Sequence, residues 1–270
     1  MPGNQETKYL RKGKGDEMKE KLYTIPLNDA VNAKEECPFC YIERAVEQDI
    51  IDFVLGSGSS YMESDVREAT DKAGFCREHF KKMFDYGNTL GNGWILKTHY
   101  MQMNKEMKEQ FKKFTPSKSS LMGKFKKSAE RENPIGMWVQ EKEKSCYICN
   151  RFGDTYDRYM DTFFYMYKND GDFRRRIHES KGFCLHHFGD LCEYSETRLN
   201  DKEKKEFYPA MFGLMEKNME RLQEDVSWLG EKFDYRYKDA DWKNSKDAVQ
   251  RGMQKLKGGY PADEPYKMNK

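Results

Sequence analysis

Six of the seven cysteines and two of the five histidines stand in two sets with the same order and nearly the same spacing. Each set has a Cys-x-x-Cys pair followed by a Gly-Phe-Cys-x-x-His stretch. The first set contains Cys37, Cys40, Cys76 and His79, and the second contains Cys146, Cys149, Cys184 and His187. Three cysteines and one histidine are a standard ligand set for structural zinc. The sequence therefore predicts two metal ions, with zinc as the expected metal.

The spacing does not decide which pairs share an ion. In the simplest assignment, the four residues of each set bind one ion. The pairs can also be exchanged between the sets, or the two sites can lie close together. Residues three apart lie on one face of a helical turn, so each pair presents its two ligands together. Both kinds of pair fall at predicted helix N-termini, where backbone amides favour the thiolate that a metal needs.

The neighbours of the ligands suit a closed site. Gly74 and Gly182 precede Phe75 and Phe183, and glycine allows the sharp turn that lets each Cys-x-x-His pair face inward. The aromatic side chains would shield the ligands from water. Because closed sites with four protein ligands are usually structural, the sequence gives little support to metal-assisted hydrolysis.

Two other chemistries use the same residues. An iron–sulfur cluster is held mainly by thiolates, with histidine as an occasional ligand. Thiol–disulfide exchange uses Cys-x-x-Cys motifs, and the stretch 37–40 resembles one locally. That motif normally stands in a βαβ setting, which this sequence lacks, and exchange leaves both Cys-x-x-His pairs unused. Metal binding is therefore the leading interpretation, and an iron–sulfur or thiol-based redox protein or enzyme is the alternative.

One cysteine and three histidines stand outside both sets; His99, His178 and His186 could be extra ligands or proton carriers, but each alone is weak evidence. Cys192 aligns with Phe84, at a position expected to face the core, and is interpreted as a small buried hydrophobic residue. His186 aligns with Glu78 and is expected at the surface. Neither residue is therefore assigned as a ligand.

The stretch 156–167 is unusually aromatic, and we interpret it as core packing between the two predicted units. The alternative is a pocket for a flat cofactor, in which Arg151 or Arg158 would hold an anion. The sequence contains no phosphate-binding loop, nucleophile elbow or dinucleotide fingerprint. No catalytic residue is assigned, and the sequence favours a protein that is not an enzyme.

Helical patterns surround both sets and predict an all-α fold of two tandem repeats, with about four helices in each repeat. Each repeat is expected to be pinned by one Cys3His site. Apolar residues recur at helical spacing in corresponding places, which indicates an internal duplication. Residues rich in glycine, serine and proline mark the expected helix ends. The expected helices are 38–55, 62–72, 76–87, 93–114, 147–168, 172–180, 184–198 and 202–231.

The last helix of each predicted repeat carries an apolar stripe. Apolar residues at a spacing of three to four positions lie on one side of a helix, which supports both helix predictions. The stripe residues are Leu96, Tyr100, Met103, Met107, Phe111 and Phe114 in one helix, and Met211, Met215, Met219, Leu222, Val226 and Leu229 in the other.

Composition divides the chain into five segments. Residues 1–17 are expected to form a flexible extension, and residues 18–115 the first helical metal-binding unit. Residues 116–136, rich in serine, lysine and glycine, are expected to link it to the second unit, 137–237. Residues 238–270 read as a loose polar tail.

The charge balance favours no nucleic-acid partner, because 48 basic and 46 acidic residues leave a net charge of +2. No apolar run approaches the ~20 residues of a membrane helix, and the N-terminus lacks the apolar segment of a secretory signal. The expected location is the cytoplasm, where thiols stay reduced. We therefore expect neither nucleic acid nor membrane as a partner, but a protein or small molecule that the sequence does not name.

Residues 18 to about 235 resemble an uncharacterised bacterial family, a domain-of-unknown-function group. Its members open like Met18-Lys19-Glu20-Lys21-Leu22-Tyr23-Thr24-Ile25-Pro26 and carry both cysteine sets, with Tyr61-Met62-Glu63, Tyr147-Ile148-Cys149-Asn150 and Lys181-Gly182-Phe183-Cys184 in the match. Some members carry an automatic label as transporter solute-binding proteins. This sequence disputes that label, since it has neither a signal peptide nor an alternating α/β pattern. The resemblance implies no function, so the prediction of a structural-zinc protein that acts through a partner or ligand surface rests on the ligand chemistry.

Overall fold

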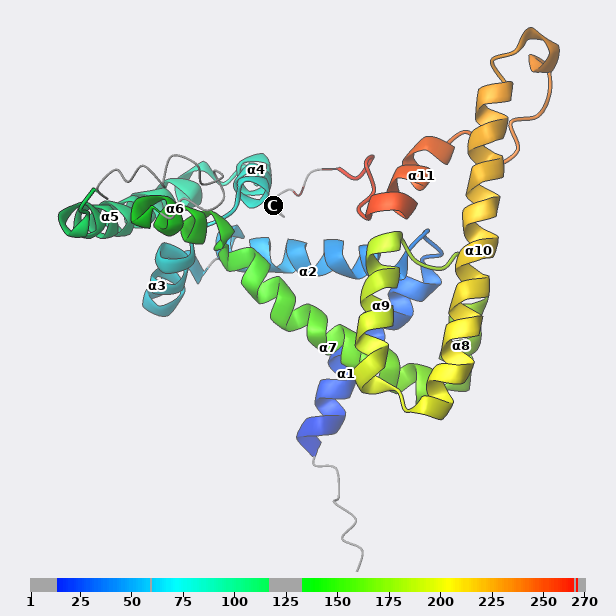
Figure 1. The fold of residues 1–270 in the computed structure, drawn as a ribbon, viewed down its shortest axis with the longest axis horizontal. Helices are drawn as coiled ribbons and strands as arrows, with labels where there is room; N and C mark the ends of the chain where they lie inside the picture. Colours follow the sequence, from blue (N-terminus) through cyan, green and yellow to red (C-terminus); the bar gives the residue numbers. More distant parts are fainter. Residues whose placement is uncertain (1–13, 59, 117–132, 265, 267–270) are drawn as a thin grey trace, which may run out of the picture. The chain divides into compact units, whose positions relative to one another are not determined.

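The chain forms helices joined by turns over the residues that the computed structural model describes, which are 14–58, 60–116, 133–264 and 266 (Figure 1). None of these residues forms a β-strand, so the expected all-α fold is confirmed. The α-helices are α1 (Lys14–Asn32), α2 (Pro38–Leu55), α3 (Ser64–Ala73), α4 (Arg77–Tyr86), α5 (Thr89–Lys113), α6 (Pro134–Lys144), α7 (Tyr147–Asn169), α8 (Gly171–His178), α9 (Leu185–Arg198), α10 (Asp201–Glu231) and α11 (Ala248–Lys257). Two short 3-10 helices are η1 (Ser60–Met62) and η4 (Tyr235–Tyr237).

All the expected helices are present, with ends that differ by a few residues, while α1, α6 and α11 were not expected. Helix α6 begins inside the expected linker 116–136. The Asn133 side chain caps it by accepting from two backbone amides, and Pro134 occupies the first turn, where its missing N–H costs nothing. Residues 117–132 of that linker lie outside the described residues, as do residues 1–13 of the expected extension 1–17.

The polar segment after residue 238 is not a loose tail throughout, because it includes α11. This helix packs against α10 and α9. Its Ala248, Gln254 and Lys255 are buried, although two of the three are polar. A search for apolar stripes misses such a helix, because part of its buried face consists of polar and charged side chains. Among them, Lys255 donates to two backbone carbonyls inside the protein.

The chain divides into two compact units that each combine residues from both predicted repeats. Unit 1 comprises residues 1–44 and 156–263, and unit 2 comprises residues 45–155 and 264–270. Helices α2 and α7 each contribute one part to unit 1 and the other part to unit 2. An internal duplication stays a prediction, whereas the division into units follows the packing of the folded chain.

Aromatic rings fill the core of unit 1. Phe163 on α7 is almost fully buried, and its ring centroid lies 5.3–6.1 Å from those of five other rings. These rings belong to Phe39, Phe164, Tyr167, Phe173 and Phe183. The aromatic stretch of α7 therefore packs in a core, as the sequence analysis favoured. Helices α9 and α10 form a hairpin, in which Asn200 caps the start of α10 (Figure 1).

Unit 2 has a smaller core around the second part of α2. Ile51, Val54 and Leu55 are fully buried there, and α3 packs along α5. The expected apolar stripe of α5 is mostly not covered, since Tyr100 is 64% exposed and Phe111 is 56% exposed. Helical spacing shows that a face is apolar but not that another element covers it.

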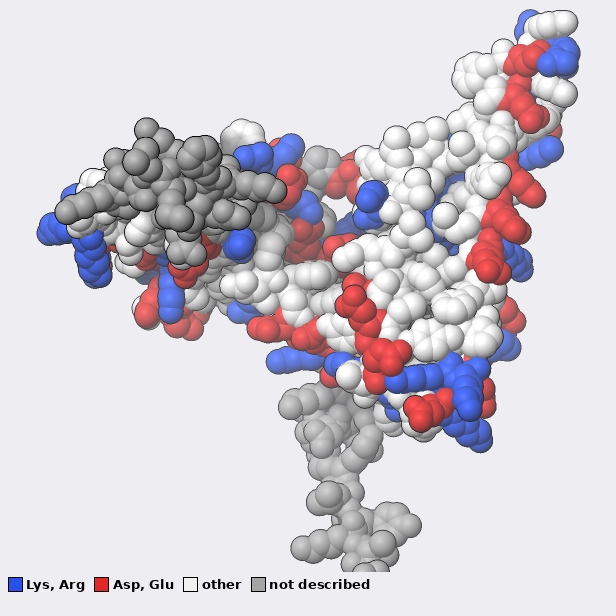
Figure 2. Space-filling view, viewed as in Figure 1, with Lys and Arg blue, Asp and Glu red and all other residues white. Residues whose placement is uncertain are grey.

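The stripe of α10 is buried along its first part and exposed near its end. Met211 is fully buried and Met215 is 5% exposed, whereas Val226 is 43% exposed. Figure 2 shows acidic and basic side chains interspersed along α10, in agreement with the balanced charge of the chain. Among the described helices, none combines the length and apolar composition that a membrane crossing needs.

Candidate metal centres

The eight predicted ligands gather in two groups of four, and the pairs are exchanged between the sequence sets. The unit 1 cluster consists of Cys37, Cys40, Cys184 and His187, and the unit 2 cluster consists of Cys76, His79, Cys146 and Cys149. Within each cluster, one ligand atom of each residue lies within 4.8 Å of the others. The structure does not bring the first Cys-x-x-Cys pair together with the first Cys-x-x-His pair. The exchanged pairing, which the spacing left open, therefore replaces the simplest assignment.

The length of α2 explains why the simplest assignment fails. The first Cys-x-x-Cys pair lies at the beginning of this helix of 18 residues, which is about 27 Å long. A rigid helix of that length carries the chain away from Cys37 before it can turn back through α3 toward Cys76. Each Cys-x-x-Cys pair therefore takes its partner from a distant part of the sequence.

The unit 1 cluster has the distances of a tetrahedral metal site. Nδ1 of His187 lies 3.4 Å from Sγ of Cys37, 3.5 Å from Sγ of Cys40 and 3.1 Å from Sγ of Cys184. The sulfurs of Cys40 and Cys184 are 3.8 Å apart. Around zinc, bonds of about 2.3 Å to sulfur and about 2.05 Å to nitrogen place two sulfurs about 3.8 Å apart and nitrogen about 3.5 Å from sulfur. Sulfurs in a disulfide would be about 2.05 Å apart, so the cluster fits a shared ion instead.

The unit 2 cluster repeats this geometry around His79. Nδ1 of His79 lies 3.2 Å from Sγ of Cys76 and of Cys146 and 3.4 Å from Sγ of Cys149. The backbone amide of Tyr147 also donates to the carbonyl of Gly74 at 2.9 Å, which joins the first residue of α7 to the turn before α4. The described cysteines are all free, so neither cluster contains a disulfide.

Each ligand pair lies at the first turn of a helix, as the sequence analysis predicted. Cys184 and Cys76 are the N-cap residues of α9 and α4. Cys37 and Cys146 immediately precede α2 and α7. The amide of His187 donates to Sγ of Cys184 at 3.4 Å. Two helix N-termini thus meet at each cluster, and their partial positive charges stabilise thiolates.

The two glycines before the Cys-x-x-His pairs make the predicted turns. Gly74 has a φ of 64° and Gly182 a φ of 74°, which side chains rarely allow. A Cβ on Gly74 would lie 2.8 Å from Cε1 of His99, and one on Gly182 would lie 3.2 Å from Sδ of Met215. At both positions a side chain would strain the backbone and would lie close to a neighbouring side chain. Glycine, which has no Cβ, avoids both problems.

A carboxylate faces the second nitrogen of each histidine. Nε2 of His79 and Oε1 of Glu47 are 2.8 Å apart, and Glu47 also accepts from Lys82 at 2.5 Å and from Tyr266 at 2.6 Å. Burial disfavours the charged form of Glu47, but these hydrogen bonds lower its pKa to about 2. In the unit 1 cluster, Nε2 of His187 lies 3.8 Å from Glu43. A carboxylate behind a metal-binding histidine fixes the tautomer that presents Nδ1 to the ion.

The negative charge of the thiolates draws positive charge into both clusters. Burial alone would lower the pKa of His79, but its contacts with Cys146 and Glu47 raise it to about 10. Burial would also lower the pKa of His187, which hydrogen bonds with two cysteines raise to about 10. Hydrogen bonds from Cys37 and Cys40 hold the pKa of the Cys184 thiol far below its ordinary value. A cation bound among the four ligands of each cluster would supply such a positive charge.

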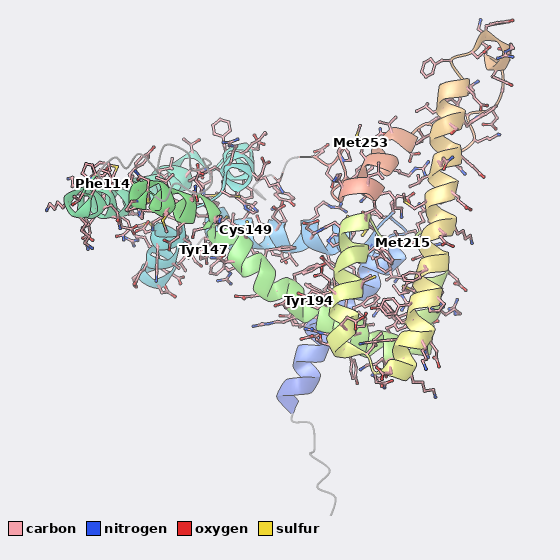
Figure 3. All side chains as sticks on the ribbon, in the orientation of Figure 1. Phe114, Tyr147, Cys149, Tyr194, Met215 and Met253 are labelled. Carbon is pink, nitrogen blue, oxygen red and sulfur yellow. The ribbon has the colours of Figure 1, made fainter. Side chains whose placement is uncertain are left out.

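The two clusters differ in burial. In unit 1 all four side chains are buried, with Cys37 and Cys184 fully covered and Cys40 2% exposed. In unit 2, Cys146 is 1% exposed, but Cys76 is half-buried and Cys149 is exposed. Cys149 lies at the N-terminal end of α7 (Figure 3).

A buried network of charged residues lies next to the unit 1 cluster, and the sequence analysis missed it. The carboxylate of Glu36, next to a cluster cysteine, lies 2.5 Å from Arg221, 3.3 Å from Arg251 and 3.4 Å from Lys255. Lys255 also donates to the carbonyls of Glu36 and Lys181 at 2.7 and 2.6 Å. No spacing rule signals this network, because its members come from the segment before α2, from α10 and from α11.

The residues excluded as ligands have mixed outcomes. His186 is exposed as expected, 3.7 Å from Asp190. The side chains of His186 and Asp190 form a small group with His187, which already belongs to the unit 1 cluster. Cys192 is half-buried. Phe84, with which it was aligned, is 80% exposed, so this position does not face the core. The short helix α4 has one covered face, and Phe84 lies outside it.

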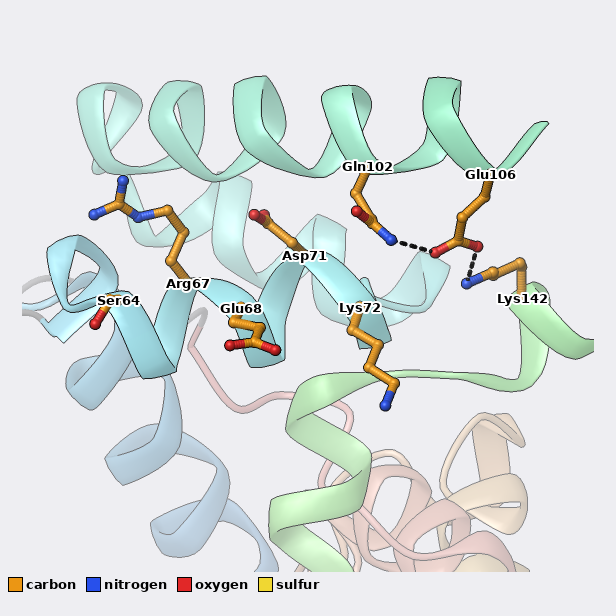
Figure 4. Close-up of a pocket in the computed structure, with 8 residues that line it drawn as sticks. All are labelled: Ser64, Arg67, Glu68, Asp71, Lys72, Gln102, Glu106 and Lys142. Carbon is orange, nitrogen blue, oxygen red and sulfur yellow. Dashed lines mark hydrogen bonds and ion pairs between the residues drawn. The ribbon is translucent and has the colours of Figure 1, made fainter. Parts of the chain in front are cut away.

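Unit 2 also has a groove of about 500 Å³ between α3 and α5. Figure 4 shows side chains of both charges around it, and the Glu106 carboxylate accepts from Gln102 at 2.7 Å and pairs with Lys142 at 2.5 Å. A second cavity, of about 370 Å³, lies in unit 1 beside Tyr167 and His178. Because acidic and basic side chains line both, neither favours a ligand of one charge.

Comparisons with known proteins give a family but no activity. No curated protein and no solved structure matches the chain. Residues 18–263 match the sequence profile of a family described as a family of unknown function, DUF6062. The match extends past α10 and through α11, so it includes both clusters and the charged network beside the first. The chain therefore belongs to the family of unknown function DUF6062.

Proposed function

We propose that the protein binds two zinc ions, one in each cluster, and that these ions hold its helix N-termini together. The observation that carries the proposal is the arrangement of Nδ1 within 3.1–3.5 Å of three sulfurs in both clusters. A mononuclear ion with four protein ligands accounts for these distances. Ligands of a polynuclear iron–sulfur cluster would stand farther apart, because they surround several iron atoms.

The proposed role of the ions is structural because each joins segments that are distant in sequence. Cys40 and Cys184 are 144 residues apart, and His79 and Cys146 are 67 residues apart. Closing loops of this length costs conformational entropy, which the metal–ligand bonds offset. Four protein ligands also leave no position for a substrate, which supports a non-catalytic ion.

We further propose that this scaffold works in the reducing cytoplasm through a protein or small-molecule partner. Free thiols arranged for metal support a reducing compartment. The apolar side chains that α5 leaves exposed, Tyr100 and Phe111 among them, support a partner surface, because large exposed apolar patches often mark interaction sites.

Metal analysis of the purified protein tests the proposal. The protein is produced in medium that supplies both zinc and iron, and metals are measured by mass spectrometry together with acid-labile sulfide and the visible spectrum. We expect about two zinc ions per chain, no sulfide and no visible absorption. A Cys192→Ser variant is the control and should bind the same amount, because Cys192 belongs to neither cluster.

Two results would contradict the proposal. Brown protein with iron and sulfide would favour the iron–sulfur alternative. Protein that binds no metal even when zinc is added, and whose cysteines form reversible disulfides, would favour thiol chemistry. X-ray absorption at the zinc edge adds a direct check, since it should show three sulfur ligands and one nitrogen ligand on average.

A further inference from the structure

The two clusters offer the same ligands but different access to solvent. Each is built from two thiolates of a Cys-x-x-Cys pair and from a Cys-x-x-His pair. Every side chain of the unit 1 cluster is buried, whereas the unit 2 cluster has Cys149 exposed and Cys76 half-buried. Replacing a ligand on a metal requires an incoming donor to approach the site, so access decides which ion can leave.

Helix α11 and the glycine after it cover the unit 1 cluster. A Cβ on Gly258 would lie 3.5 Å from Sγ of Cys184 and 3.8 Å from Sγ of Cys40, so this backbone faces two of the ligands. Lys255, which is 1% exposed, hydrogen-bonds the carbonyls of Glu36 and Lys181. Those two residues precede the two ligand-bearing turns, and Lys255 therefore ties the covering helix to both of them.

Aromatic rings close the unit 1 cluster on the side of the histidine. The rings of Phe39 and Tyr156 have centroids 5.7 and 5.8 Å from that of His187. Phe183, directly before Cys184, is fully buried. A donor from solvent would reach these sulfurs only after α11 or the aromatic core had opened.

In the unit 2 cluster the histidine is held by hydrogen bonds, whereas the side of the cluster at Cys149 is open to solvent. Glu47 holds the ring of His79, and Lys82 and Tyr266 hold Glu47 in turn. The exposed Cys149 lies in the first turn of α7 (Figure 3). Solvent therefore reaches a ligand residue of this cluster without any helix having to move.

We propose that the unit 2 cluster is an exchangeable metal site, from which a small sulfur or nitrogen donor takes the ion after displacing Cys149, while the unit 1 cluster keeps its ion. This inference rests on the proposed function, since both clusters must bind metal. In the first step Cys149 leaves as a thiolate with both electrons of its bond and takes a proton from water. The lone pair of the incoming donor forms the bond that replaces it, and nothing is oxidised or reduced.

The test follows zinc release from the full chain loaded with two zinc ions. The zinc content is measured first, and the protein is then mixed with an excess of the coloured chelator 4-(2-pyridylazo)resorcinol. Parallel samples are treated briefly with N-ethylmaleimide during release, and the labelled cysteines are identified by peptide mass spectrometry. We expect one zinc ion to leave at least about tenfold faster than the other, because the buried site must first open locally. Cys76, Cys146 and Cys149 should be labelled in step with the fast ion.

Variants separate exchange at the open site from a general loosening of the protein. Cys149→Ser should change only the fast phase, and Cys192→Ser should change neither phase. Release of both ions at one rate, or early labelling of Cys37, Cys40 and Cys184, would overturn the inference and leave the proposed function standing. A protein with no zinc at the first measurement would instead contradict the proposed function, and the inference with it.

Discussion

The two clusters show how one ligand set acquires different properties from what surrounds it. In unit 1 the ligands lie in an aromatic core, and Gly258, directly after α11, faces two of their sulfurs. In unit 2 a short hydrogen bond from His79 to Glu47 supports the histidine, but one ligand residue, Cys149, is exposed. Unit 1 thus stabilises its site by burial, and unit 2 does so by a hydrogen-bond network. We infer from the comparison that the ligand types decide which metal binds, while the residues around the ligands decide how firmly the metal is retained.

The largest expected effect comes from removing one matched cysteine in each cluster. Cys184→Ser and Cys76→Ser replace the N-cap residue of α9 and of α4, respectively. A structural zinc contributes on the order of 10 kcal/mol to folding, so losing an ion should cost its unit several kcal/mol. The effect should be greater for Cys184→Ser, because water can reach the half-buried position of Cys76 and act as a replacement ligand.

Zinc content and hydrogen exchange resolved by peptide measure this difference. Cys184→Ser should release one zinc ion and lower protection in 156–198, whereas Cys76→Ser should lower protection in 64–86. Loss of protection in the same peptides for both variants would show that the ligand pairs are not arranged as the structure has them. Cys192→Ser is the matched control outside both clusters.

The next effect concerns the cover of the unit 1 cluster. Lys255→Met removes the buried ammonium that faces Glu36 and two backbone carbonyls. Breaking a buried ion pair by removing one partner costs about 3–5 kcal/mol, and we expect a loss near the lower end, since Arg221 and Arg251 still face Glu36. Urea unfolding measures the loss. Lys257→Met on the same helix should change stability by less than about 0.5 kcal/mol, because Lys257 is exposed.

The ligands and their local geometry could be predicted from sequence because both depend on short-range spacing. A Cys-x-x-His stretch after a glycine predicts a turn, an N-cap and two ligands on one face, and Gly182, Cys184 and His187 show all three. The ends of α2 and α7 were also predicted closely, since proline, glycine and the Cys-x-x-Cys pairs mark them. Each of these features is decided within one or two helical turns.

The pairing, the cover and the exposed faces could not be predicted because they depend on long-range packing. Which Cys-x-x-His pair meets Cys37 depends on the direction in which α2 carries the chain. Helix α11 contributes the buried polar residues Lys255 and Gln254. Because its sequence is polar, no apolar pattern predicted that this helix packs against the core. The stripes of α5 and α10 look alike in sequence, but Tyr100 is 64% exposed and Met211 is fully buried. Periodicity describes one helix, whereas burial depends on a second element.

The glycines before α4 and α9 offer a smaller and more local comparison. Gly74 has φ 64° and ψ −159°, a region that is essentially restricted to glycine. Gly74→Ala should cost about 2 kcal/mol, from backbone strain of about 1–3 kcal/mol and from the contact with His99. Gly182→Ala should cost about 1 kcal/mol, near the lower end of that strain range, because its contact with the flexible Met215 is longer.

Thermal unfolding of the zinc-loaded variants measures how much stability each substitution costs, and so tests the expected order. Gly93→Ala is the control, because Gly93 lies within α5 and a Cβ there would meet nothing within 4 Å. That change should stabilise the protein by about 0.5–1 kcal/mol. If Gly74→Ala were as harmless as Gly93→Ala, the turn before α4 would not have the conformation that brings Cys76 to its cluster.

The smallest expected effect is on metal affinity, when the carboxylate next to each histidine is replaced. Glu47→Gln removes the charge that lies 2.8 Å from His79, and Glu43→Gln removes one 3.8 Å from His187. Losing a carboxylate partner of a metal-binding histidine typically weakens metal binding by about 10–100-fold, and we expect about tenfold for Glu47→Gln because glutamine still accepts a hydrogen bond. For Glu43→Gln we expect less than about threefold, since the longer distance gives a weaker interaction. Competition titrations with a zinc chelator, read separately for each ion, measure both. An equal loss at the two clusters would mean that the hydrogen-bond network of unit 2 contributes no more to holding its ion than the distant carboxylate of unit 1 does.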